Sequence, residues 1–415
     1  MENRINSQSV LHHFPVRRIY EFLIFFLLMV PDDVFRMLPL YTNKSPNYIV
    51  YKWLDYSYNI ILFTVMLTGL LVAVKKKDKV ILGLTLLVFF RELIFLLLGE
   101  NSCFTDGSYE IYLTLFTGVA LAIIVQDLFH SVEDHSKFFW FVMVANAMTV
   151  YIAYAMGLMV KNSHRYNAIN LDVGSTGTIC SLIILYCIFS ETIRYRLIIA
   201  MITLVALFLS GSRINLLFVV FFLLFGIVIR LLQKKSFEKK SVYGFVFVAM
   251  IGMVLLMMMD ANSQNLLNNS SMSISRMISS FSFSEMEDDT SVLGRTRSIF
   301  IGFDIIKHHP FGISGYFTNL QVETVQRGFY TFPHSLILDY YIFLGPILIL
   351  LVIRIIRCLV VLFKREFSQF MVLLYLLAFV TFSGGPIVNF KLVFFYATII
   401  LISIRMCKVS TEISE

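Results

Sequence analysis

Two arginine-containing segments offer the clearest chemistry in this sequence. A Ser-Gly-Ser-Arg segment ends at Arg213, and a Gly-Arg-Thr-Arg segment ends at Arg297. An arginine guanidinium is a planar fork of donors that fits phosphate oxygens, and serine hydroxyls can add hydrogen bonds. The two segments predict an anion-binding site, and its candidate residues are Ser210, Ser212, Arg213, Arg295 and Arg297.

Ordinary structural roles compete with anion binding at these arginines. Arg213 lies at the end of an apolar segment, where an arginine side chain can extend to lipid headgroups. Arg295 and Arg297 are expected at the start of a helix over residues 295–307, where the helix dipole disfavours cations. A bound anion would relieve that conflict, and so would pairing with the acidic residues at 285–289. The sequence leaves both alternatives open.

His334 is the candidate for proton transfer. It directly precedes a long apolar segment, and an imidazole there can take or give a proton near neutral pH. A lone histidine at an interface is, however, more often structural. The adjacent His308 and His309 point apart and lack an obvious third ligand, and Walker, dinucleotide-binding and HExxH motifs do not occur. We therefore expect neither a metal nor a cofactor.

Apolar segments must position these residues. Of the 415 residues, 58% are hydrophobic and only 15% are charged, which excludes a water-soluble globular protein. The net charge of +7 comes mostly from short basic runs between apolar segments, which indicates membrane orientation rather than nucleic-acid binding. The sequence predicts an all-α, polytopic membrane protein with about twelve transmembrane helices. They lie near residues 19–40, 54–74, 80–98, 109–129, 138–160, 173–190, 197–212, 214–232, 241–259, 335–358, 368–387 and 390–406.

The basic runs fall on alternate sides of the predicted membrane, which places both termini in the cytoplasm. Three regions follow: nine transmembrane helices in residues 1–259, a large extracytoplasmic loop in residues 260–334, and three further helices in residues 335–415. Inside the third segment, Arg91 and Glu92 are expected to pair with other helices. Residues adjacent in sequence do not face each other on a helix, and unpaired charges in lipid are expensive.

Taken in order, three blocks resemble the O-antigen polymerase and O-antigen ligase superfamily of bacterial membrane glycosyltransferases. The Ser-Gly-Ser-Arg turn between two apolar segments comes first. The long outside loop then carries Gly-Arg-Thr-Arg and the stretch from His309 to Gly315, and it closes with Pro-His-Ser around His334. Ser335 stands where asparagine is frequent in the family, and Phe343-Leu344 replaces the usual acidic residue before Gly345. These departures leave polymerase and ligase both open, and the first half of the chain matches only in hydropathy.

The resemblance implies a metal-independent enzyme that uses sugars carried on undecaprenyl diphosphate at the outer leaflet of the bacterial inner membrane. A polymerase moves the growing glycan onto the next lipid-linked repeat unit, whereas a ligase moves it onto another acceptor, such as a lipid A core. Neither reaction needs a nucleotide sugar or ATP. The arginines would then neutralise the diphosphate, and His334 would accept or orient the proton of the acceptor hydroxyl.

The favoured function is therefore a repeat-unit polymerase for capsule, O-antigen or exopolysaccharide, with a ligase of the same fold as the nearest alternative. The expected partners are undecaprenyl-diphosphate-linked oligosaccharides, membrane lipids, and flippase and chain-length regulator proteins, but not nucleic acid. A flippase or other transporter would also have about twelve helices. Such a protein is expected to cluster charges at mid-membrane and to have related halves, whereas this sequence concentrates its polar chemistry in one outside loop.

Overall fold

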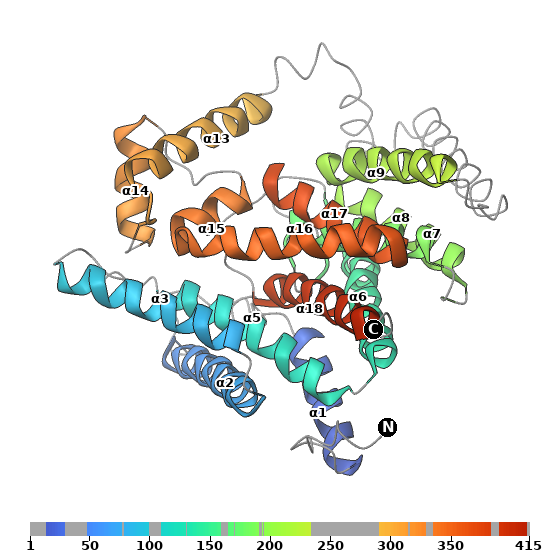
Figure 1. The fold of residues 1–415 in the computed structure, drawn as a ribbon, viewed down its shortest axis with the longest axis horizontal. Coiled ribbons are helices and arrows are strands. Elements are labelled where there is room, and N and C mark those ends of the chain that lie inside the picture. The colour runs from blue at the N-terminus through green and yellow to red at the C-terminus, as the bar shows by residue number, and fades with distance from the viewer. Residues whose placement is uncertain are drawn as a thin grey trace. The chain divides into compact units, whose positions relative to one another are not determined.

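In the part of the chain that it describes, a computed structural model shows 14 helices and no strand (Figure 1). The chain divides into two compact units, which are treated separately below. The structure describes residues 14–29, 48–76, 79–98, 109–129, 131–158, 165–169, 171–190, 193, 195–233, 290–313, 316–328, 335–382 and 390–412.

The first unit is held together by helices that approach each other closely at glycines. It contains α1 (Phe14–Met29), α2 (Tyr48–Lys75), α3 (Lys79–Leu97), α5 (Tyr109–Leu128) and α18 (Phe390–Glu412). A Cβ atom added to Gly69 of α2 would lie 2.4 Å from Cβ of Ala120 in α5. One added to Gly118 of α5 would lie 2.6 Å from the carbonyl oxygen of Phe390 in α18. Small residues at such contacts are typical of helix packing in membranes.

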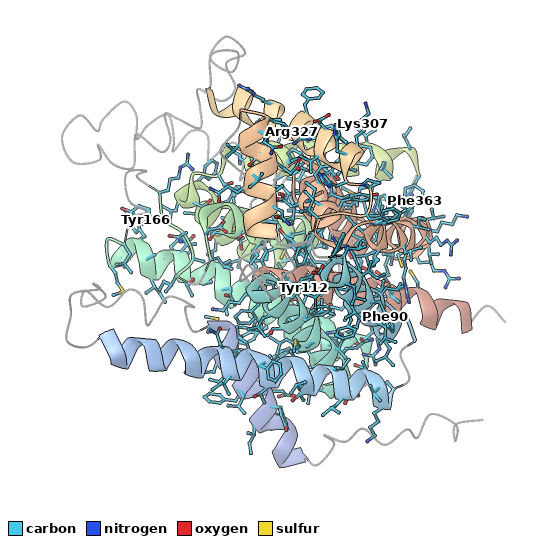
Figure 2. The ribbon with its side chains drawn as sticks, turned by 90° about the vertical axis from the view of Figure 1, so that its left-hand side faces the viewer. Phe90, Tyr112, Tyr166, Lys307, Arg327 and Phe363 are labelled. Atoms are coloured by element: carbon cyan, nitrogen blue, oxygen red, sulfur yellow. The ribbon has the colours of Figure 1, made fainter. Side chains whose placement is uncertain are left out.

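Arg91 and Glu92 of α3 both contact a second helix, as expected, through Tyr112 of α5, but they also pair with each other, which the sequence argument did not predict. The Arg91 Nη1 atom lies 2.9 Å from Oε1 of Glu92. The hydroxyl of Tyr112 in α5, a residue that Figure 2 labels, donates to the same carboxylate. The long arginine side chain can fold back over its own helix. Direct pairing lowers the cost of holding both charges among apolar side chains.

The second unit carries the candidate chemistry. It contains α7 (Val173–Phe189), α8 (Arg196–Ser210), α9 (Arg213–Leu232), α13 (Thr290–His308), α15 (Leu336–Leu344), α16 (Ile347–Arg365) and α17 (Phe367–Phe382). Two helices are divided between the units, α6 (Val132–Ala155) and α14 (Tyr316–Gln326). Asp172 caps α7 by accepting a hydrogen bond from the Ser175 amide at 2.7 Å. Helix α7 packs against α8, α9 and α17, and α15 packs against α13, α16 and α17.

The single span predicted over residues 335–358 is wrong, because two helices occupy this stretch. Helix α15 ends before Gly345, whose φ of +66° lies outside the helical region, and Pro346 directly precedes the first residue of α16. Glycine adopts this backbone at little cost, and proline is favoured at a helix start because it needs no amide partner there. Because of this break, α15 and α16 are two separate helices and not one continuous span.

The described helices are consistent with a helical membrane protein. Two of them are long and apolar enough to cross a membrane by length and composition alone, Val132–Ala155 and Phe390–Cys407, and six shorter apolar helices accompany them. Large apolar side chains such as Leu71 and Phe221 are 69% and 61% exposed, which suits contact with lipid better than contact with water. The number of twelve spans stays a prediction. The ninth predicted span, residues 241–259, lies outside the described residues, as does 30–40 of the first.

Candidate functional site

The turn between α8 and α9 is the most sharply defined part of the candidate site. Gly211 ends α8 with a left-handed backbone at φ +61°, and its amide donates to the carbonyl of Phe208. Glycine is the favoured residue in this conformation at a helix end. Ser210 is buried, and its hydroxyl donates to the Leu207 carbonyl at 2.7 Å. Ser212 is also buried, and its oxygen accepts a hydrogen bond from Asn215 at 2.8 Å.

Arg165 covers this turn from the segment that precedes α7. A Cβ atom added to Gly211 would lie 3.0 Å from Cγ and 3.4 Å from Nε of Arg165. The amide of the next residue, Tyr166, donates to the Leu209 carbonyl at 3.0 Å. Gly211 therefore gives the turn its shape and leaves room for an arginine side chain over it.

Arg213 is the first residue of α9, and only its backbone is described. A cation at the start of a helix is disfavoured by the helix dipole, and an anion bound there would offset this effect. The two predicted serines thus flank the left-handed glycine, and the predicted arginine follows at the helix start. The hydroxyls of both serines contact protein atoms in this arrangement.

Arg295 and Arg297 do not begin a helix, which corrects the prediction of a helix over residues 295–307. Helix α13 starts at Thr290, so both arginines lie beyond its first turn. The argument from the helix dipole therefore does not apply to them. The Arg297 side chain is exposed, and its Nη2 atom donates to the Gly328 carbonyl at 3.4 Å. The Arg295 side chain lies outside the described residues, although its backbone is helical.

An ion-pair network joins α13 to the end of α14 near Arg297. Arg327 donates to Asp304 Oδ2 at 2.7 Å and also pairs with Glu323, and His309 Nε2 lies 3.1 Å from Oε1 of Glu323. Figure 2 labels Arg327, and it also labels Lys307 of α13. The hydrogen bond from Arg327 holds the pKa of the Asp304 carboxyl below its usual value. Sequence patterning did not predict α14, and this network was missed with it.

His334 lies outside the described residues, but Ser335, which follows it, is firmly anchored. The Ser335 hydroxyl donates to the Thr381 carbonyl in α17 at 2.8 Å, and its oxygen caps α15 by accepting from the Leu338 amide. The hydroxyl of Tyr341 in α15 donates to the Pro310 carbonyl at 3.0 Å. These contacts fasten both the segment after His334 and the Pro-Phe-Gly segment to the same helix.

The Ser-Gly-Ser-Arg turn, helix α13 and the start of α15 all lie in one continuous stretch of the sequence that is similar to a known family. Residues 198–353 match the O-antigen ligase family. This match confirms the family resemblance for that stretch, here called the O-antigen ligase segment. No curated protein matches the chain.

The O-antigen ligase segment covers less than half of the 415 residues, and it is the part of the chain that is similar to that family. It contains all six predicted site residues, and the roles assigned to them stay predictions. Asn215 and Arg165 were missed as site residues. Asn215 had a weak signal, since it is an amide inside a strongly apolar segment, whereas Arg165 could be linked to the turn only through the fold.

Proposed function

We propose that this protein is a polysaccharide polymerase that transfers a growing glycan from its undecaprenyl diphosphate carrier to the next lipid-linked repeat unit. The observation that carries the proposal is the match of residues 198–353 to the O-antigen ligase family. That stretch includes the Ser-Gly-Ser-Arg turn, the arginines of α13 and His334. The reaction takes place at the outer leaflet of the bacterial inner membrane, and both termini lie in the cytoplasm.

In the proposed reaction, the acceptor hydroxyl oxygen bonds to the anomeric carbon of the donor sugar. The bond from that carbon to the diphosphate oxygen breaks, and the lipid diphosphate leaves with the electron pair. His334 accepts the proton of the acceptor hydroxyl or orients that hydroxyl. Arg213, with Arg295 and Arg297, binds the diphosphate and stabilises the charge that develops on it. Ser210 and Ser212 shape the turn that holds Arg213.

The proposal uses a lipid diphosphate that is already a good leaving group, so positioning and charge neutralisation supply the catalysis. It needs no metal, nucleotide or other cofactor. A ligase is the second candidate function, because the matching family is described as O-antigen ligase. The two differ only in the acceptor, which is another lipid-linked repeat unit for a polymerase and a different molecule for a ligase.

Replacing His334 and Arg213 one at a time tests the proposal in cells. A general base contributes about 10²–10⁴-fold in rate, so His334→Ala should leave single repeat units and little long polymer. Arg213→Lys keeps the charge but loses the two-pronged geometry and should also impair polymer formation. Polymer length on a gel is compared with the amount of protein in the membrane.

The distribution of product separates the two candidate functions. Loss of a polymerase leaves single repeat units on the final acceptor, whereas loss of a ligase leaves long glycan on the lipid carrier. Normal glycan from His334→Ala and from Arg213→Ala, at normal protein level, would remove the basis of the mechanism.

A further inference from the structure

Asn215 lies two residues after Arg213 and ties the Ser-Gly-Ser-Arg turn to helix α7. Its Nδ2 atom donates to Oγ of Ser212 at 2.8 Å and to the carbonyl oxygen of Gly174 at 3.2 Å. Gly174 lies in the first turn of α7. One amide group therefore holds the turn before α9 against the start of another helix.

The other half of the same amide is held by α7 and α17. Asn215 Oδ1 accepts a hydrogen bond from the Tyr375 hydroxyl at 2.7 Å and one from Oγ1 of Thr178 at 3.3 Å. Asn215, Tyr375 and Thr178 are all 0% exposed. An asparagine amide offers two donor hydrogens and two acceptor lone pairs, and all four have partners here.

Helix α7 makes room for this arrangement at Gly177. A Cβ atom added to Gly177 would lie 2.6 Å from Nδ2 of Asn215 and 2.6 Å from Cβ of Ser212. The side chain of Asn215 consequently cannot shift toward α7, and its hydrogen bonds fix it in the other directions. The first turn of α9 is therefore held by two other helices, α7 and α17, through one residue.

We infer that Asn215 is a positioning residue that fixes the first turn of α9 so that Arg213 can bind the lipid diphosphate. The inference rests on the proposed role of Arg213. If Asn215 served stability alone, its replacement would have the same effect whether residue 213 is arginine or lysine. An amide that acts through Arg213 should lose its effect on activity once the arginine fork has been removed.

A double-mutant cycle between Asn215→Ala and Arg213→Lys tests this inference. Rates are measured per mole of purified full-length protein with a lipid-diphosphate-linked repeat unit as substrate. In the wild-type background, Asn215→Ala should lower the rate by between about tenfold and about 10²-fold, because a small misplacement of a catalytic group can have effects of that size. In the Arg213→Lys background, the same change should lower the rate by less than about twofold, since coupled residues are not additive.

Asn146→Ala is the matched control, because Asn146 is another fully buried asparagine in the same unit but on α6. It should reduce the amount of folded protein without reducing the rate per mole. If Asn215→Ala fails to reach the membrane, Tyr375→Phe removes one of the four hydrogen bonds and replaces it in the cycle. Tyr375→Phe should lower the rate by less than Asn215→Ala does, and this loss should also disappear in the Arg213→Lys background.

The outcomes separate the inference from the function on which it depends. Equal fold losses in both backgrounds, or a normal rate per mole for Asn215→Ala, would overturn the positioning role while leaving a diphosphate-binding Arg213 intact. A normal rate for Arg213→Lys alone would overturn the two-pronged diphosphate contact proposed for Arg213 and the inference with it, but it would leave the polymerase function open to the test with His334→Ala. A loss of rate confined to the wild-type background supports both.

Discussion

Gly211 illustrates how a single residue sets the geometry of the candidate site. It has a left-handed backbone at φ +61°, and Arg165 lies over the position that a side chain would occupy. Any other residue would meet both the conformational restriction and the arginine. The glycine of the Ser-Gly-Ser-Arg motif is therefore required by two independent features of the fold.

Gly211→Ala should destabilise the protein by about 1–2 kcal/mol through the left-handed backbone alone. It should also lower activity, because Arg165 must move. Gly83→Ala is the control, since Gly83 lies within α3 with a helical backbone and open space where the Cβ atom would go. Alanine is favoured over glycine inside a helix by about 0.5–1 kcal/mol, so Gly83→Ala should leave stability equal or slightly raised. Thermal unfolding in detergent measures both, and equal effects of the two changes would contradict this role for Gly211.

At the residue scale, the sequence indicates candidate residues by their type but does not predict their contacts. Arg213 and the two serines stand out as polar residues between apolar segments. The hydrogen bonds of Asn215 come from α7 and α17, which lie far away along the chain. Single-sequence patterns report neighbours along a helix and cannot report such partners. For the same reason, the sequence does not indicate that Arg165 lies over the turn.

At the scale of elements, the break between α15 and α16 determines where the segment after His309 packs. A Cβ atom added to Gly345 would lie 2.4 Å from the carbonyl oxygen of Phe311. The amide of Ile313 donates to the Ile342 carbonyl of α15 at 2.8 Å. The segment after His309 therefore packs directly on the break, which connects two motifs that lie apart in the sequence.

Gly345→Ala should destabilise the protein more than Gly157→Ala does. Both glycines have positive φ, at +66° and +65°, but nothing lies within 4 Å of the Cβ position at Gly157. The control thus measures the cost of a positive φ in open space, about 1–2 kcal/mol, whereas Gly345 also has a ψ of −152°, a backbone conformation that is restricted almost to glycine. The clash with Phe311 should add a further ~1–3 kcal/mol. Unfolding midpoints of the two purified variants give the comparison, and equal midpoints would show that the contact with Phe311 contributes nothing.

The hydropathy pattern predicted most described helices to within a few residues. Residues 173–190 and 214–232 were expected, and α7 and α9 cover Val173–Phe189 and Arg213–Leu232. The span over residues 335–358 was misjudged because hydropathy averages across Gly345 and Pro346. Helix α14 was missed because it is short and largely polar. On α13, the side chains of Phe300 and Phe303 are 69% and 58% exposed, whereas those of Ile301 and Ile305 are buried.

At the scale of the whole molecule, composition and the family match point in the same direction. The apolar helices are consistent with a membrane protein, and residues 198–353 match the O-antigen ligase family. The polar residues proposed to act on the diphosphate fall within that stretch. The twelve-helix topology and the identity of the acceptor are whole-molecule properties that depend on the membrane and the substrate, so sequence patterns alone could only propose them.

Reconstitution of the purified protein in liposomes tests the central claim most directly. The liposomes contain a lipid-diphosphate-linked repeat unit, and the buffer contains a metal chelator and no nucleotide. We predict a ladder of longer lipid-linked glycans, with one lipid diphosphate released for each bond formed, and about 10²-fold or greater loss of both with His334→Ala. The claim would be contradicted if the folded protein formed no ladder, or if it only moved intact lipid-linked units across the bilayer without joining them.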